Sequence, residues 1–136
     1  MNKIFLTFCL LCIFDIHYHE FNPAHLVINE VDQVNNHYQA TWMYPFKNIG
    51  RRAEISFPKE CIVEYGDLYY QGKYINEKIN LECSNSLKGL KIEIINLSVL
   101  TDALITINFL NDTFEGLVNV QNNVIDIPLE TQYYPS

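Results

Sequence analysis

The amino-acid sequence predicts an all-β protein: a single antiparallel Ig-like β-sandwich of about eight strands after an amino-terminal signal segment. Three observations predict this class. Apolar and polar residues alternate with a period of two, which places every second side chain on one face of an extended strand. Turn-forming residues separate the alternating runs. After residue 20 there is no amphipathic helix of about ten or more residues.

The first predicted strands take their buried faces from this alternation. A β-rich run at 24–31 opens the domain, and the next run places Tyr38, Ala40, Trp42 and Tyr44 on one face. We expect these aromatic side chains, with Trp42 at the centre, to form one half of the core. A short run follows at 53–57, and the alternation is clearest at 75–83.

The remaining strands supply the other half of the predicted core. Ile105 and Ile107 lie on the apolar face of the run at 103–109, and they are the core residues we expect from this part of the chain. Asn, Gly and Ser mark the turns between the runs, as at Gln71-Gly72 and Asn122-Asn123. The other strands of this half are expected at 90–94, 114–120 and 124–129.

The amino-terminal segment predicts export. Lys3 precedes an apolar run of 11 residues from Ile4 to Phe14, which is too short to span about 30 Å of hydrocarbon but is typical of a secretory signal. Residues 1–18 are therefore interpreted as a signal peptide or an uncleaved apolar anchor, and residues 19–130 as the β-sandwich domain. A buried amino-terminal helix or strand is the alternative.

Charge and motif content exclude several function classes. Nine Lys and Arg against 16 Asp and Glu give a net charge of −7, without a cluster of cations that would neutralise phosphates, so we expect no nucleic-acid partner. The sequence contains no nucleophile elbow, phosphate-binding glycine loop or zinc-protease helix. We therefore expect a protein that is not an enzyme.

Two cysteines remain beyond the signal segment. An even pair in an oxidising compartment predicts one disulfide, between Cys61 and Cys83. Two separate buried thiols are the alternative. Cys9 and Cys12 lie inside the apolar run, where we expect no metal or redox site.

One histidine-rich stretch could bind metal. His17, His19, Glu20 and His25 lie within nine residues, and imidazole and carboxylate are good ligands for nickel, copper or zinc. A polar lead-in to the first strand, which binds no metal, is the alternative, because a complete site needs further ligands held in place.

Seven segments, in order along the chain, resemble the opening region of HupE/UreJ-type hydrogenase and urease accessory proteins. The first is HEFNPAHL at 19–26, which resembles the family's HE-x-x-PA-x-L, and the second is YQATW with Pro45, which resembles Y-x-V-x-W-x-x-P. The others are FPKEC at 57–61, LEC at 81–83, LKG at 87–89 with Ile92 and Leu97, LTDALI at 100–105, and Ile127-Pro128.

The resemblance implies an extracytoplasmic module of a membrane protein family that handles nickel or other metals. Family members continue into several transmembrane helices, which would begin at the 131–136 tail of this chain. The resemblance therefore implies an accessory or interaction role in the periplasm or cell envelope. The chain would be either free there or anchored to the membrane. A separately encoded membrane domain or another membrane protein is the expected partner. Glu60 stands where the family usually has glycine, and Asn85-Ser86 replaces a glycine pair.

Two other functions stay open at this stage. The chain is alternatively a free-standing extracytoplasmic metal-binding protein that uses its amino-terminal histidines for nickel or copper. An adhesin or pilus-type subunit is a third interpretation, and it rests on fold class alone. The sequence leaves the oligomeric state undetermined.

Overall fold

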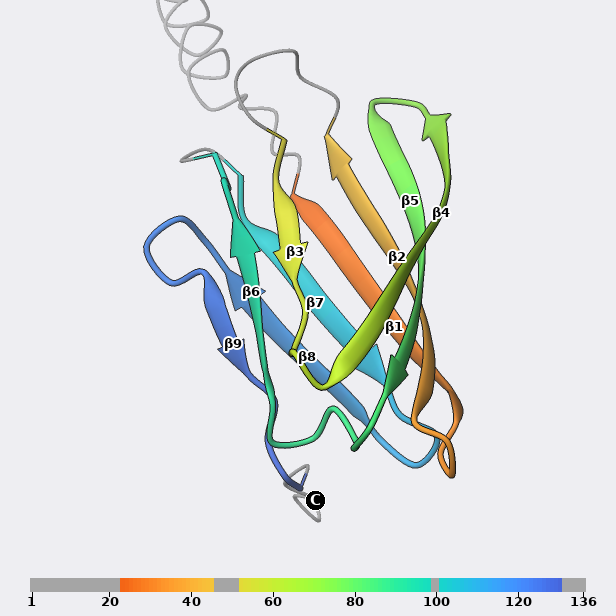
Figure 1. The fold of residues 1–136 in the computed structure, drawn as a ribbon. Helices are drawn as coiled ribbons and strands as arrows, with labels where there is room; N and C mark the ends of the chain where they lie inside the picture. The colour runs from red at the N-terminus through yellow and green to blue at the C-terminus, as the bar shows by residue number, and fades with distance from the viewer. Residues whose placement is uncertain (1–22, 46–51, 99–100, 131–136) are drawn as a thin grey trace, which may run out of the picture.

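The computed structural model describes residues 23–45, 52–98 and 101–130. Its described part is all-β and contains no helix, so the predicted fold class is confirmed (Figure 1). The nine strands are β1 Ala24–Asp32, β2 His37–Pro45, β3 Glu54–Ser56, β4 Cys61–Gln71, β5 Tyr74–Cys83, β6 Lys91–Ile95, β7 Ala103–Asn108, β8 Thr113–Val118 and β9 Val124–Asp126.

The strands form two unequal layers. The large sheet has the order β4-β5-β2-β1-β7-β8, and the small sheet has the order β3-β6-β9. Figure 1 shows the small sheet in front of the side of the large sheet that is formed by β1, β7 and β8, with β4 and β5 on the other side. Every pairing is antiparallel except that of β1 with β7, which is parallel. A period of two is common to both kinds of strand, so the sequence pattern could not distinguish them.

The core lies between the two sheets and contains the five residues predicted for it. Tyr38, Trp42, Tyr44, Ile105 and Ile107 are all buried, because each points from the large sheet toward the small one. The Trp42 indole N–H donates a hydrogen bond to the carbonyl oxygen of Ala53, just before β3, at 3.3 Å. This bond holds the start of β3 over β2.

Buried polar groups at one end of the sandwich are paired. The Tyr38 hydroxyl accepts a hydrogen bond from the Leu87 N–H at 3.1 Å, and its ring meets Phe109 edge to face. Glu30 is buried beside it, and its Oε1 accepts a hydrogen bond from the Leu110 N–H at 3.0 Å. Burial raises the pKa of Tyr38 above its usual value. A buried acceptor without a donor would cost about 1–3 kcal/mol, so these bonds keep the end of the core closed.

One strand was not predicted from the sequence. None of the eight predicted runs covers 61–71, which forms β4, the longest strand of the described chain. Its residues Tyr65 to Gln71 are all exposed, so no buried face produces the alternation on which the other strands were recognised.

Gly116 on β8 lets β9 approach the large sheet closely. A Cβ atom built on this glycine would overlap Cδ1 of Ile125 on β9 and come within 3.4 Å of the Phe114 ring. Ile125 is buried there, so the glycine leaves space that a larger residue would take from the core.

We expect Gly116→Ala to lower the free energy of unfolding by about 1–3 kcal/mol, the usual range for overpacking. The loss of unfolding free energy in the double variant Gly116→Ala/Ile125→Ala should be smaller than the sum of the losses in the two single variants, because the new methyl group fills space that Ile125 vacates. Denaturant unfolding of the four proteins measures this difference, and strictly additive losses would contradict the contact.

Candidate functional site

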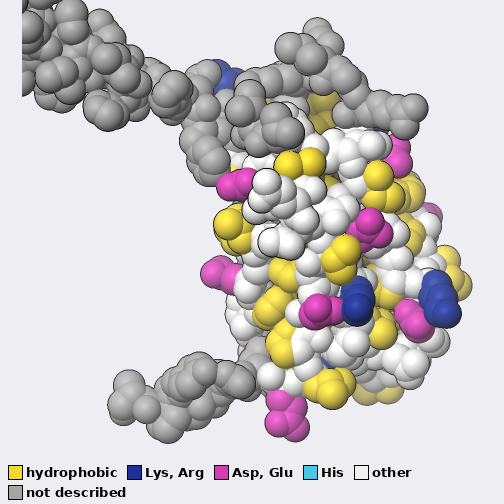
Figure 2. Space-filling model, turned by 90° about the vertical axis from the view of Figure 1, so that its left-hand side faces the viewer, with side chains coloured by type: hydrophobic (Ala, Val, Ile, Leu, Met, Phe, Trp, Pro, Cys, Tyr) yellow, Lys and Arg dark blue, Asp and Glu magenta, His cyan; other side chains and the backbone are white. Residues whose placement is uncertain are grey.

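Exposed apolar side chains gather on β4. This strand carries five of the thirteen large apolar or aromatic side chains that are exposed among the described residues. These five are Ile62, Tyr65, Leu68, Tyr69 and Tyr70. We call residues 61–71 the β4 edge. Figure 2 shows the side of the molecule away from β4, where apolar side chains are separated by polar and charged ones.

The β4 edge exposes part of the face that would normally belong to the core. Its register with β5 places Tyr65, Leu68 and Tyr70 opposite Ile79, Glu77 and Ile75, on the side of the sheet that faces the small sheet. Ile79 and Glu77 are buried, whereas Tyr65, Leu68 and Tyr70 are 57%, 50% and 71% exposed. The small sheet, positioned over β2 by the Trp42–Ala53 bond, therefore does not cover β4.

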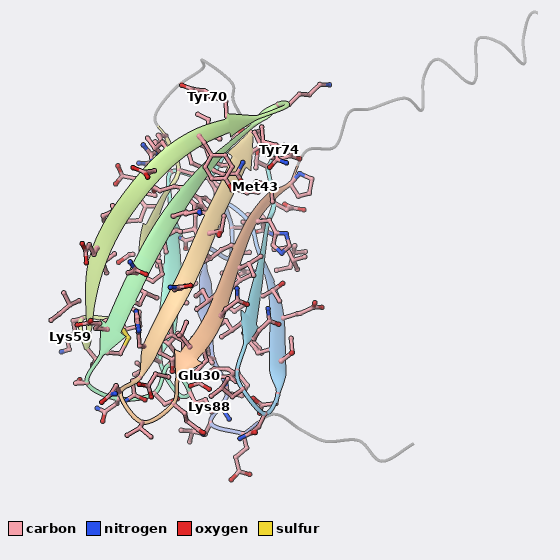
Figure 3. The ribbon with its side chains drawn as sticks, turned by 90° about the vertical axis from the view of Figure 1, so that its right-hand side faces the viewer. Glu30, Met43, Lys59, Tyr70, Tyr74 and Lys88 are labelled. Carbon is pink, nitrogen blue, oxygen red and sulfur yellow. A yellow bond between two sulfur atoms is a disulfide. The ribbon has the colours of Figure 1, made fainter. Side chains whose placement is uncertain are left out.

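The backbone of β4 also faces outward. In the described part of the chain β4 pairs with β5 alone and forms one margin of the large sheet (Figure 3). The Cα atoms of Cys61 and Cys83 are 3.9 Å apart, which is the short spacing of a cross-strand pair that forms no hydrogen bonds with each other. In such a pair each residue directs its N–H and C=O groups away from the other strand. The same alternation directs the backbone groups of Val63 and Tyr65 to the outer side.

A β-bulge changes this alternation in the middle of β4. Gly66 and Asp67 together lie opposite one residue of β5, so the register moves by one residue between Tyr65 and Leu68. After the bulge, the two-residue turn that begins at Gly72 (φ +60°) sets the alternation. Gln71 and Tyr74, which flank the turn, form a hydrogen-bonded pair, so Leu68 and Tyr70 direct their backbone groups outward. A Cβ on Gly66 would lie 3.3 Å from the Lys78 carbonyl oxygen, so the bulge brings the two backbones close.

An ion pair lies beside the exposed tyrosines. Arg52 donates a hydrogen bond to the buried Glu77 at 2.6 Å, and its guanidinium lies 5.0 Å from the centre of the Tyr44 ring. Burial raises the pKa of Tyr65, and the negative charges of Glu77 and Glu54 raise it further. The Tyr65 hydroxyl therefore stays protonated at neutral pH, which does not suit it to act as a nucleophile.

Both ends of the β4 edge are fastened to β5. The predicted disulfide between Cys61 and Cys83 is present and joins the strands where β4 begins. The tight turn at Gly72 joins them where β4 ends. These two connections hold an exposed strand that has little packing of its own in a defined position.

Only one of the four predicted metal ligands lies among the described residues. His17, His19 and Glu20 lie outside the described residues. His25 lies on the outer face of β1, and its Nε2 is 3.2 Å from Thr106 Oγ1 in a hydrogen bond. Within 23–45, 52–98 and 101–130, no three His, Cys, Asp or Glu side chains are close enough to hold a metal ion.

A second surface feature is a shallow hollow of about 580 Å³ near the disulfide. It is lined by Asp32, Asn35, His37, Glu60, Ile62, Glu82, Cys83 and Ser84. The Asp32 carboxylate accepts hydrogen bonds from the side chain and the backbone N–H of Asn35 in the turn after β1. These bonds hold the carboxylate in place and lower its pKa. The hollow thus offers acidic groups that do not converge on a point.

The β4 edge was not predicted, because neither an alternation with a buried face nor a cluster of ligand residues marks it in the sequence. One signal was present: the run IVEYGDLYY holds three tyrosines and ends at the Gln71-Gly72 turn.

No family model matches the chain, and a search of curated proteins finds no match. The described residues form no helix that is long and apolar enough to cross a bilayer.

We expect Cys83→Ala to lower the free energy of unfolding by about 2–5 kcal/mol, because the bridge joins positions 22 residues apart. Denaturant unfolding measures the loss, and reduction of the natural protein is the matched control, since it should produce a similar change. Peptide mapping that finds Cys61 and Cys83 as free thiols in the natural protein would contradict the pairing.

Removal of Arg52 should leave the buried Glu77 carboxylate without its charged partner. We expect Arg52→Ala to cost about 1–2 kcal/mol, a value reduced by solvent screening because the arginine side chain is 41% exposed. Adding Glu77→Gln should recover part of the loss, since the neutral amide needs no counter-charge. Thermal unfolding in which Arg52→Ala matches the natural protein would show that the pair contributes nothing.

Proposed function

We propose that this chain is an exported, non-enzymatic β-sandwich module that binds a partner chain through its β4 edge. The proposal follows the accessory role implied by the resemblance to the extracytoplasmic region of HupE/UreJ-type proteins, including a link to the handling of nickel or another metal. The exposed β4 edge carries the proposal on the structural side.

The physical chemistry of the β4 edge supports a binding role. An exposed edge strand is a template for another strand, and proteins often protect such edges with charges, bulges, proline or a covering loop. The β4 edge has a bulge and two exposed charges, Glu64 and Asp67. It also exposes large side chains on both faces: Tyr65, Leu68 and Tyr70 on one, and Ile62 and Tyr69 on the other. Each aromatic ring can bury about 150–250 Å² of surface in a contact.

Two observations support export. The segment before residue 19 has the pattern of a secretory signal, and the Cys61–Cys83 disulfide is compatible with an oxidising compartment. Such disulfides are rare where glutathione keeps thiols reduced. The periplasm or another part of the cell envelope is the location that we propose.

A photoreactive amino acid tests the binding role directly. With p-benzoylphenylalanine in place of Tyr65 or Tyr69, illumination of cells that make the full chain should join it to one discrete protein, identified by mass spectrometry. The matched control replaces Leu117, which is 61% exposed on β8 at the other margin of the sheet. Equal labelling from all three positions, or none from β4, would overturn the proposed function.

A further inference from the structure

We propose that the Cys61–Cys83 disulfide is a redox switch for the β4 edge. The oxidised bond keeps the edge ordered for its partner, and reduction by a protein dithiol loosens the edge. The inference rests on the proposed function and adds its regulation. Three features carry it: the place of the bond in the fold, its accessibility, and the division of β4 by the bulge.

The disulfide joins two neighbouring strands of one sheet. Cys61 is the first residue of β4, and Cys83 is the last residue of β5. The bond does not connect the two sheets, whose contact depends on the core between them. Reduction therefore leaves the packing of the layers in place and acts on the attachment of β4 to β5.

The bond is accessible from the β4 side. Cys61 is half-buried, whereas Cys83 is 7% exposed, and Figure 3 shows the yellow S–S bond at the margin of the sheet near Lys59. The Cα atoms are 3.9 Å apart, below the separation of about 4.4–6.8 Å that most disulfides span, and bridges outside that range are reduced more easily. Exposed disulfides are typically the labile and regulatory ones.

Reduction proceeds by two exchange steps. A thiolate of the dithiol attacks the sulfur of Cys61, the more exposed cysteine, and forms a mixed disulfide with it. The Cys61–Cys83 bond breaks, and Cys83 leaves as a thiolate that takes a proton from water. The second thiol of the reductant then attacks the mixed disulfide and releases Cys61. In total, two electrons and two protons pass to the cysteine pair, and the dithiol becomes a disulfide.

The bulge at Gly66–Asp67 divides β4 into two halves with different attachments. The second half continues into the turn at Gly72 and stays next to β5 through the chain itself. The first half, residues 61–65, has two hydrogen-bonded pairs with β5, at Ile62 and Glu64, because its other positions direct their backbone groups outward. Segments with few buried contacts and exposed ladder bonds open locally at low cost. The first half is therefore the part that the disulfide secures.

After reduction, β5 keeps its place while the start of β4 loosens. The Cys83 N–H donates a hydrogen bond to the carbonyl oxygen of Asn36 at 3.1 Å, and β5 is paired with β2 on its other side. The Ser84 N–H donates to the carbonyl oxygen of Glu60 at 2.9 Å, and this link does not need the disulfide. The change is thus a local opening of residues 61–65, not loss of the whole strand.

Amide hydrogen exchange of the full chain, before and after treatment with dithiothreitol, tests the opening. We expect the Ile62 and Glu64 amides to exchange about tenfold or more faster after reduction, with a smaller change at Tyr69 beyond the bulge. Low urea concentrations should alter the new rates little, because a local opening exposes little surface. Acceleration by one common factor at Ile62, Glu64 and the core residue Ile105 would overturn the switch, since the bond would then add only global stability.

The double variant Cys61→Ala/Cys83→Ala is the matched control. It should show the reduced pattern from the start and should not respond to dithiothreitol, although it retains Cys9 and Cys12. A response of this variant would assign the effect to those two cysteines and overturn the proposal. In the natural protein, mass spectrometry after alkylation should find the bond reduced without denaturant. Reduction only in urea that unfolds the protein would contradict the accessibility of the bond.

Photocrosslinking connects the switch to binding and separates it from the proposed function. With p-benzoylphenylalanine at Tyr65, the Cys61→Ala/Cys83→Ala chain should give much less partner adduct than the chain with both cysteines, and the loss should be smaller with the probe at Tyr69. Equal adduct from both chains overturns the regulation and leaves the binding role standing. No adduct from either chain, with probes at both positions, overturns the proposed function and the regulation of binding with it.

Discussion

The position of the small sheet on the large one determines which strands have a buried inner face and which have an exposed one. The Trp42 side chain is buried between the layers, and its indole N–H is bonded to the carbonyl oxygen of Ala53 at the start of β3. This contact holds the start of β3 over β2, while β9 at the other edge of the small sheet packs against β8 at the margin of the large one. The inner face of β2 is thereby buried, and the inner face of β4 is left uncovered.

The uncovered strand is nevertheless held in place. The Cys61–Cys83 disulfide and the turn at Gly72 fix the two ends of β4 to β5, and the Arg52–Glu77 pair fills the boundary between the covered and uncovered parts of the inner face. The same fastening keeps the backbone groups of the β4 edge ordered for another strand, which reduces the entropy that binding must overcome.

The bulge at Gly66–Asp67 limits what can bind there. Bulges and charged residues at sheet edges commonly prevent indiscriminate pairing. Here Gly66 and Asp67 interrupt the regular ladder at the middle of β4, and Asp67 adds a charge at the same place. Of the predicted histidine site, the described residues include only His25, which is hydrogen-bonded to Thr106 on the outer face of the sheet.

The sequence by itself determined the fold class and the five predicted core residues, because burial on one face imposes an alternation that is visible in the residues. It also determined the cysteine pair, because only two cysteines follow the signal segment. It did not reveal β4, whose exposed face imposes no such pattern. Only the tertiary structure decided that β1 and β7 are parallel and that the small sheet stops short of β4. Both depend on contacts between segments far apart in the chain, and local residue patterns carry no information about which distant segment a strand will meet.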